Sequence, residues 1–242
     1  MFPAPALFDQ VLDVPAIKGV IETSFVDWPE RLCAVLFIGG CNFRCPFCHN
    51  PELVLAPEAL ATLSMAQVLE QLAPLRKWLG GICITGGEPT LDPHLGSLVA
   101  LLKAEGWWVK LDTNGSRPEV LEQLLAGGLL DMVAMDVKAP LTDEQYRGCA
   151  GVRVDLKVIR RSIALLRESG IAHQFRMTVV PGFHGEREVE AWVASLVGRG
   201  RLTLQNFKPG TTLNPALLPA TGFPPAIFDG LCRLVPERQE KE

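Results

Sequence analysis

Long hydrophobic runs are missing from this chain of 242 residues; none approaches the ~20 residues that a membrane-spanning helix needs. The N-terminus has neither the basic segment nor the long apolar core of a secretory signal peptide, so we expect a cytoplasmic location, where thiols stay reduced. Positive charge is not in excess either, since the net charge of −4 argues against a general nucleic-acid binder. The four histidines, His49, His94, His173 and His184, form no convincing acid–base set. We therefore expect neither a membrane nor a nucleic acid as partner.

Cysteines are where the chain is most informative. Cys41, Cys45 and Cys48 lie in the run Gly-Cys-Asn-Phe-Arg-Cys-Pro-Phe-Cys-His-Asn-Pro, residues 40–51. Three thiolates on one short loop can hold three corners of a cubic iron–sulfur cluster, whereas such clusters normally use four cysteines. The fourth iron would then be open to a ligand. The remaining cysteines, Cys33, Cys83, Cys149 and Cys232, are scattered, and we expect small buried hydrophobic side chains.

Three other interpretations of this run remain open. Cys45 and Cys48 form a C-x-x-C that is also typical of a redox dithiol, and with His49 they form the attachment pattern of a c-type haem. Together with Cys41, the same residues could make a Cys₃His zinc site. A dithiol leaves Cys41 unexplained, haem attachment takes place outside the cytoplasm, and the adjacent side chains of Cys48 and His49 usually diverge. The cluster is therefore the favoured interpretation.

The rest of the chain alternates between strand-like apolar runs and helix-like periodic segments. Strands are expected at 33–38, 82–85, 107–111, 132–135, 175–180 and 202–205. Helices are expected between them, one of them capped by Ser64 and interrupted near Pro74, and another opened by Asp92 and Pro93. Alternation of this kind implies parallel strands joined by right-handed crossovers. Six such units make an incomplete α/β barrel.

Three further segments complete this expectation. Residues 14–31 are expected to form an N-terminal extended or hairpin element, and residues 209–225, rich in proline, threonine and glycine, an ordered loop or lid. Residues 236–242 are expected to be a charged, frayed end.

Chemistry-bearing residues follow the predicted strands. The cysteine run comes after the first strand, Gly86-Gly87-Glu88-Pro89 after the second, and Asp112 with Thr113 at the end of the third. Asp136 and Lys138 end the fourth. Because active sites of parallel α/β barrels form at the carboxyl ends of the strands, we expect all of these groups around one site.

In these motifs the chain resembles the radical S-adenosylmethionine (SAM) enzymes. The C-x-x-x-C-x-x-C spacing with Phe47 before the last cysteine is typical of that superfamily, and the following His-Asn-Pro is typical of the activases of glycyl radical enzymes. The likeness extends through the segments 24–31, 86–89, 111–115, 134–138 and 175–181 and covers residues 18 to 207. In order and spacing it is similar to the anaerobic ribonucleoside-triphosphate reductase activating proteins, with the pyruvate formate-lyase activating enzymes as close relatives.

The resemblance implies the fold and the cofactors. The fold would be a partial (β/α)6 TIM-like barrel of the radical SAM type, with the short N-terminal extended element and the C-terminal loop or lid. Residues 1–242 would form a single domain, with a core at 18–207 and a C-terminal extension at 208–242. The cofactors would be one [4Fe–4S] cluster, bound by Cys41, Cys45 and Cys48, together with SAM and a monovalent cation. SAM contacts are implied for Phe47, Gly86, Gly87, Glu88, Asp112, Thr113, Asp136, Lys138 and Arg176.

Individual roles follow from the same resemblance. Phe47 would pack near the adenine, and the Gly86–Gly87 backbone would approach the SAM amino group, which Glu88 would help to hold. The alternative interpretations are a loop-anchoring aromatic ring for Phe47 and a simple turn for the glycines.

The acidic residues would serve the other end of the cofactor. Asp112, Thr113 and Asp136 would form a monovalent-cation site near the SAM carboxylate, Lys138 would contact the cofactor, and Arg176 would touch the ribose or the carboxylate. For Asp136, Lys138 and Arg176, structural ion pairs are the alternative.

Two features depart from the relatives or stay open. Formate-lyase activases have a tyrosine and a histidine near the end of the sixth strand, where this chain has Gln205 and Phe207. Trp28, in the run Asp-Trp-Pro, would be either a contact for a partner protein or a hydrophobic plug.

The function implied is the activation of a glycyl radical enzyme. The chain would cleave SAM reductively to a 5′-deoxyadenosyl radical and take a hydrogen atom from a glycine of its partner, anaerobic ribonucleotide reductase, with flavodoxin or ferredoxin as electron donor. Alternatives are a small-molecule enzyme similar to 7-carboxy-7-deazaguanine synthase, an activase of the formate-lyase type, and a non-catalytic cluster carrier.

Overall fold

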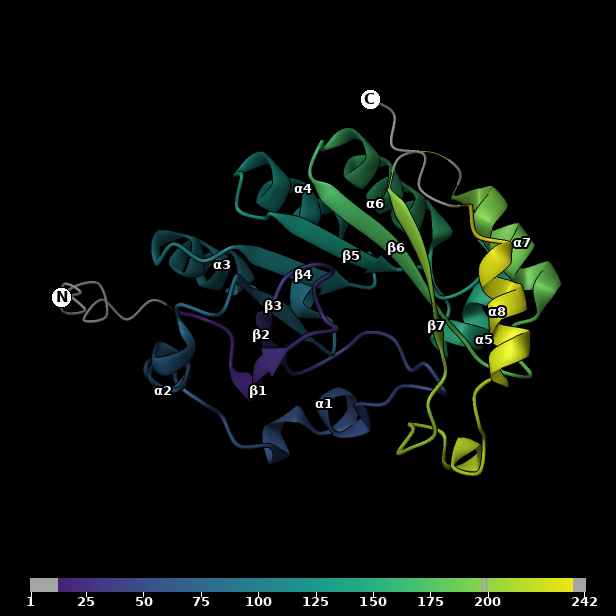
Figure 1. The fold of residues 1–242 in the computed structure, drawn as a ribbon, viewed down its shortest axis with the longest axis horizontal. Helices are drawn as coiled ribbons and strands as arrows, with labels where there is room; N and C mark the ends of the chain where they lie inside the picture. Colours follow the sequence, from purple (N-terminus) through teal and green to yellow (C-terminus); the bar gives the residue numbers. More distant parts are fainter. Residues whose placement is uncertain (1–12, 197, 199, 237–242) are drawn as a thin grey trace.

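The computed structural model describes residues 13–196, 198 and 200–236 of the chain. Over these residues seven strands form one sheet in the order β1 to β7 (Figure 1). Strand β1 pairs antiparallel with β2, and every later neighbour pairs in parallel. The strands are β1 (Ile17–Ser24), β2 (Cys33–Ile38), β3 (Gly81–Gly86), β4 (Val109–Thr113), β5 (Met132–Asp136), β6 (Ala172–Val179) and β7 (Arg201–Asn206).

Helices α3 (Leu95–Ala104), α4 (Pro118–Ala126) and α6 (Leu156–Glu168) lie along the outer face of this curved sheet (Figure 1). The other helices are α1 (Pro51–Leu55), α2 (Met65–Leu72), α5 (Asp143–Ala150), α7 (Glu186–Ser195) and α8 (Pro225–Arg233). Strands β1 and β7 are the two edges of the sheet and do not pair with each other. The expected α/β architecture, an incomplete barrel of parallel β/α units with an N-terminal extended element, is therefore confirmed.

Local sequence explains why several elements begin where they do. The Ser64 hydroxyl accepts a hydrogen bond from the Gln67 backbone N–H, and the Gln67 side-chain oxygen accepts one from the Ser64 backbone N–H. Ser64 therefore caps α2, as expected, and the two bonds form a complete capping box. The α2 helix ends at Leu72, and the chain continues through Pro74 as a 3₁₀ turn. Strands β2 and β3 consist almost entirely of buried residues, as strands covered on both faces require.

Three elements begin two or more residues away from the expected position, and one of them is β6, which begins at Ala172 instead of residue 175. Strand β4 begins at Val109 instead of residue 107, and the preceding Trp107 and Trp108 stack under the guanidinium groups of Arg76 and Arg31. Helix α3 begins at Leu95 instead of residue 93. The Asp92 carboxylate accepts from the His94 backbone N–H at 2.9 Å and so closes a turn ahead of the helix.

Helices α1, α5 and α8 were not expected from the sequence. Helix α5 is polar along most of its length, and α1 has only five residues, so neither gives a strong periodic signal. The segment 209–225 is an ordered loop with one 3₁₀ turn, as expected. Of the expected frayed end, residues 237–242 lie outside the described residues. No described helix has the length and apolarity to cross a membrane.

Candidate functional site

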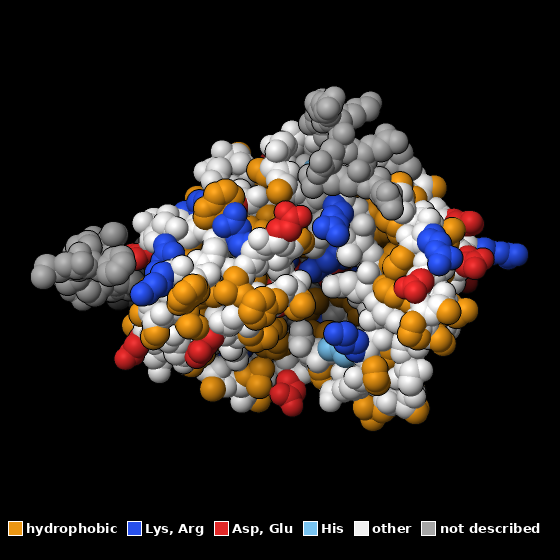
Figure 2. Space-filling view, viewed as in Figure 1, with side chains coloured by type: hydrophobic (Ala, Val, Ile, Leu, Met, Phe, Trp, Pro, Cys, Tyr) orange, Lys and Arg blue, Asp and Glu red, His pale blue; other side chains and the backbone are white. Residues whose placement is uncertain are grey.

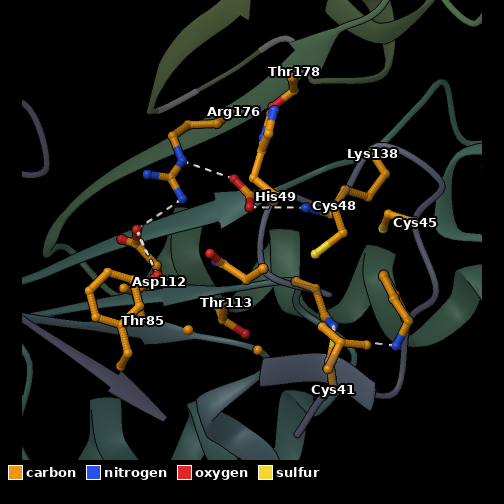
Figure 3. A pocket seen from close by; sticks show the side chains of 18 of the residues that line it. Cys41, Cys45, Cys48, His49, Thr85, Asp112, Thr113, Lys138, Arg176 and Thr178 are labelled. Atoms are coloured by element: carbon orange, nitrogen blue, oxygen red, sulfur yellow. Dashed lines mark hydrogen bonds and ion pairs between the residues drawn. The ribbon is translucent and has the colours of Figure 1, made fainter. Parts of the chain in front are cut away.

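A cavity of about 400 Å³ opens at the carboxyl ends of the parallel strands. Cys41, Cys45 and Cys48 line it together with residues from β3, β4, β5 and β6. In Figure 3 the cysteines lie on one side of the cavity, and Asp112 and Arg176 face them across it. The expectation that the strand-end motifs meet the cysteine loop is met, because parallel strands bring their carboxyl ends to one edge of the sheet.

Hydrogen bonds to helices α1 and α5 hold the cysteine loop in place. The Gly40 N–H donates to the Leu53 carbonyl at 2.7 Å, and the Arg44 N–H donates to the Ala150 carbonyl at 2.8 Å. The Arg44 guanidinium also donates to the Cys41 carbonyl at 2.6 Å. These bonds fix the loop backbone on either side of Cys41, so the three thiols project into the cavity from a defined frame.

The thiols suit a group larger than a single metal ion. Among the described residues, no three histidine, cysteine or acidic side chains converge on one ion position. Burial raises the pKa of Cys45 to about 12 and also raises that of Cys41, so thiolates in this apolar setting need strong compensation by bound metal. Three separated cysteines around a cavity fit an iron–sulfur cluster, in which each cysteine binds a different iron.

His49 lines the same cavity, but its Nε2 is bonded to a backbone carbonyl and it does not complete a Cys₃His set. Its Nε2 forms a hydrogen bond of 2.8 Å with the Lys208 carbonyl, and its ring stacks on Phe207 at a centroid distance of 5.1 Å. The backbone N–H groups of Leu213 and Asn214 donate to the Cys48 and Pro46 carbonyls at 3.0 and 2.9 Å. The segment that follows β7 thus binds the cysteine loop directly.

Gly86 and Gly87 line the cavity, and the absence of a Cβ atom at each leaves room for neighbouring backbone atoms. A Cβ on Gly87 would lie 1.9 Å from the Gly40 carbonyl oxygen, and one on Gly86 would lie 2.3 Å from that of Ile38. Gly86 also has φ of +123°. Gly87 thus allows close approach of the cysteine loop, and Gly86 close approach of the end of β2, while the approach of a ligand to these glycines stays a prediction.

Glu88 points away from the cavity that its neighbours line. Its carboxylate is 1% exposed and accepts hydrogen bonds from the Thr90 N–H and hydroxyl, the Thr113 hydroxyl and the Asn114 N–H. Burial raises its pKa in spite of these bonds. Among the predicted SAM contacts, Glu88 therefore binds Thr113 directly but does not line the cavity itself, and its carboxylate ties the end of β4 to the turn after β3.

Asp112, Arg176, Asp136 and Lys138 do come together, as a chain of alternating charges on the cavity wall (Figure 3). Arg176 bridges both carboxylates, at 3.0 Å to Asp112 and 2.9 Å to Asp136, and Lys138 binds Asp136 at 3.0 Å. Burial opposes these charges, but Arg176 and Lys138 hold the pKa of Asp136 well below its usual range. Asp136 in turn raises the pKa of Lys138 above its ordinary value.

The other predicted residues are also placed at the cavity. Phe47 is buried and packs edge-on against Phe183, while still lining the cavity. Thr113 lines it while its hydroxyl is bonded to Glu88. Gln205 lines the cavity, whereas Phe207 stacks under His49.

Sequence reasoning missed several residues here. Thr85, Asn114 and Thr178 line the cavity, and Lys110 lies behind it, paired with Asp112. Asn114 directly follows Asp112 and Thr113 in the chain, so its place beside two predicted site residues could have identified it. Lys110 gave none, because a lysine inside an apolar strand is rarely buried.

Trp28 is a plug and not a surface contact. It is 5% exposed, and the Arg31 guanidinium lies 5.3 Å from the centre of its ring. Its neighbours Phe25 and Val26 are instead 82% and 88% exposed, on the turn between β1 and β2. The backbone N–H groups of Val26 and Asp27 donate to the Ser24 hydroxyl, which orders this turn. Figure 2 shows hydrophobic side chains gathered on the face that carries β1, beside a hollow bordered by basic groups.

The remaining cysteines match the expectation of a structural role. Cys33, Cys83 and Cys149 are buried, at 0%, 0% and 3% exposure, and Cys232 is half-buried on α8. They lie outside the lining of the cavity.

Comparison with known proteins gives consistent matches. Residues 35–192 match the radical SAM superfamily. A Methanocaldococcus jannaschii protein named as a glycyl-radical enzyme activating enzyme is 31% identical over 198 residues, which are 80% of each chain. The pyruvate formate-lyase-activating enzyme of Staphylococcus aureus is 34% identical over 184 residues, which are 71% of each chain.

A relative of a different class also matches. The 7-carboxy-7-deazaguanine synthase of Neisseria meningitidis is 32% identical over 134 residues. That match covers 54% of this chain and 56% of the synthase, so the chain spans little more than half of that relative.

A solved structure supports the fold. Streptococcus suis SuiB bound to S-adenosylmethionine superposes with a TM-score of 0.58 at 15% identity. The superposition covers 80% of this chain and 44% of SuiB, so this chain spans less than half of that protein. The likeness confirms the incomplete barrel as the common architecture.

Proposed function

Because this chain belongs to the radical SAM superfamily, we propose that it is the activating enzyme of a glycyl radical enzyme. The family brings one [4Fe–4S] cluster and SAM as cofactors. The observation that carries the proposal is the cavity in which three cysteine thiols face a polar wall at the strand ends. Two relatives that are named as activating enzymes, and that match over most of their length, support the same proposal.

Cys41, Cys45 and Cys48 would hold the cluster and leave one iron open for SAM. A reduced cluster held there would supply one electron to the sulfonium of SAM, whose C5′–S bond would break to give methionine and a 5′-deoxyadenosyl radical. The buried side chains of Phe43, Cys45 and Phe47 in the cysteine loop would exclude water from this side of the cavity, as radical chemistry requires.

The polar wall would orient SAM. Lys138 and Arg176 offer cationic groups to a carboxylate or to ribose hydroxyls, and Asp136 fixes both in place. Thr113 and Asn114 present polar atoms at the end of β4, held there by Glu88. Since the radical is generated on the cofactor, no side chain in this wall needs to act as a general base.

The substrate proposed is a backbone glycine Cα–H of a partner protein, and hydrogen-atom transfer would leave the radical on that glycine. Phe25 and Val26 support a protein substrate, because two exposed apolar side chains sit on an ordered turn whose neighbours Ile21 and Asp27 line the cavity. We propose anaerobic ribonucleotide reductase as the partner and flavodoxin or ferredoxin as the electron donor.

The test is anaerobic reconstitution followed by electron paramagnetic resonance. The reconstituted protein, dithionite, SAM and a purified anaerobic ribonucleotide reductase are mixed, and we expect the doublet of a glycyl radical. The matched control is the reductase with that glycine replaced by alanine, which should give no doublet. If SAM is cleaved but no glycyl enzyme acquires a radical, the chain is not an activase.

A second function is favoured by the match to 7-carboxy-7-deazaguanine synthase. In that case the cavity would take a small pterin in place of a glycine loop, and its volume of about 400 Å³ lies in the range of small-molecule sites. Binding of a purified pterin to the SAM-loaded protein, measured by equilibrium dialysis, separates the two functions. A mere cluster carrier would form no 5′-deoxyadenosine on reduction with SAM.

A further inference from the structure

Both carboxylates of the cavity wall are fully engaged by cations of the protein itself. One oxygen of Asp136 accepts from Arg176 and the other from Lys138, at 2.9 and 3.0 Å. One oxygen of Asp112 accepts from Arg176 at 3.0 Å, and its second oxygen is bound by Lys110. These are the same carboxylates for which the sequence implied a monovalent-cation site.

Lys110 is the unusual member of this group. It is 0% exposed and lies on β4, two residues before Asp112, so both side chains project from the same face of the strand. Besides Asp112, its Nζ contacts the Cys83 sulfur at 3.5 Å. A lysine ammonium is stable in such a setting only if it is paired, so its charge and that of Asp112 depend on each other.

An added alkali cation does not fit this arrangement. Such ions are bound by several oxygen ligands, and the four carboxylate oxygens here already face ammonium or guanidinium groups. Three protein cations against two carboxylates leave the group with a net charge of +1, which repels a further cation. The implied cation site is therefore already filled, from within the chain.

We propose that Lys110 replaces the monovalent cation in this protein. Its ammonium neutralises Asp112, and Asp112 then holds Arg176 in the position from which it faces the cavity. Lys110 is a positioning residue, since it lies behind the wall and does not line the cavity. The inference rests on SAM binding in this cavity, and it does not depend on which partner is activated.

The first test needs no variant. SAM binding to the reconstituted holoenzyme, without reductant so that no turnover occurs, is measured by isothermal titration in sodium, potassium or N-methylglucamine chloride at equal ionic strength. We expect the same dissociation constant in all three salts. A wild-type protein that loses SAM affinity when sodium and potassium are both absent would overturn the proposal.

The second test replaces the ammonium. In Lys110→Met the volume is nearly kept and the charge is lost, so we expect SAM affinity in N-methylglucamine to fall about tenfold, with a melting temperature about 10 °C lower. Potassium or sodium should restore the affinity to within about threefold of wild type by binding to the freed Asp112 oxygen. Restoration specific to small cations is the signature that a purely structural lysine would not give.

The control is Lys103→Met. Lys103 also pairs with a partly buried aspartate, Asp131, at 2.8 Å, but it lies on α3, outside the cavity lining. We expect no dependence of its SAM affinity on the type of cation. A Lys110→Met protein that binds SAM like wild type in every salt, or that no small cation restores, overturns the proposal. Because no partner is present in these assays, their outcome is separate from that of the glycyl-radical test.

Discussion

Glu88 gives the sharpest test of how this site is built. If it ties β4 to the turn after β3, its loss lowers the melting temperature; if it contacts SAM, its loss lowers the affinity for SAM. Both of its carboxylate oxygens face a backbone N–H: Thr90 N at 3.1 Å on one and Asn114 N at 2.5 Å on the other. In Glu88→Gln, one of these N–H groups must face the NH₂ of the new amide. The substitution therefore breaks a buried bond whichever way the amide turns.

The size of the effect follows from these contacts. Losing one charge-assisted hydrogen bond costs about 1.5–3 kcal/mol, and the buried N–H left without an acceptor costs about 1–3 kcal/mol more. Relief from burying an ionised carboxylate offsets part of this, since burial already raises the pKa of Glu88. We expect a net loss of about 3 kcal/mol, or about 6–12 °C in melting temperature for a chain of this size.

The direction of the pKa shift also fixes a pH dependence. A carboxyl whose pKa is higher in the folded than in the unfolded protein contributes most stability below its unfolded value and loses it as the pH rises through the folded one. The difference in stability between wild type and Glu88→Gln should therefore be largest at low pH. This difference in stability should decrease as the pH rises, beginning near 4.5, the ordinary pKa of a glutamate carboxyl.

The assay is thermal unfolding followed by circular dichroism under argon, with SAM affinity measured on the same preparations. Glu119→Gln is the control, because Glu119 is half-exposed and pairs with Arg117 at the surface, where such pairs contribute about 1 kcal/mol or less. If Glu88→Gln melts like wild type but binds SAM far more weakly, Glu88 contacts the cofactor directly and the role assigned here is refuted.

Three further changes test the cysteine loop and the rim. Cys45→Ala should lose most of the roughly four irons per chain expected for the cluster, whereas Cys232→Ala should keep them in an iron assay. His49→Ala should keep its iron but melt about 4–8 °C lower by calorimetry, because it loses a hydrogen bond and a ring contact. Phe25→Ser with Val26→Ser should leave stability within about 0.5 kcal/mol and raise the KM for the glycyl partner about tenfold, measured by radical yield.

Each of these has an outcome that contradicts it. Full iron content in Cys45→Ala would remove that thiol from the cluster. Loss of metal in His49→Ala would return the Cys₃His zinc interpretation to consideration. Unchanged kinetics in the double serine variant would mean that the partner docks away from the turn between β1 and β2.

Local spacing accounts for what the sequence determined. Three cysteines within eight residues must share one loop, and apolar runs alternating with amphipathic segments impose parallel strands whose carboxyl ends meet at one edge. The loop, the incomplete barrel and the gathering of Asp112, Asp136 and Lys138 at one rim follow from those two facts, whereas only the family resemblance implied the place of Arg176. Even the capping box at Ser64 is a local pattern.

Tertiary structure decided which way individual side chains turn and what they meet. His49 binds a carbonyl 159 positions away, Glu88 turns to a backbone N–H 26 positions away, and Arg176 joins carboxylates from two other strands. Lys110 is buried only because a carboxylate on its own strand and the sulfur of Cys83 on β3 meet its ammonium. Hydrogen bonds and ion pairs between distant segments depend on the final packing, so no local sequence pattern could have predicted them.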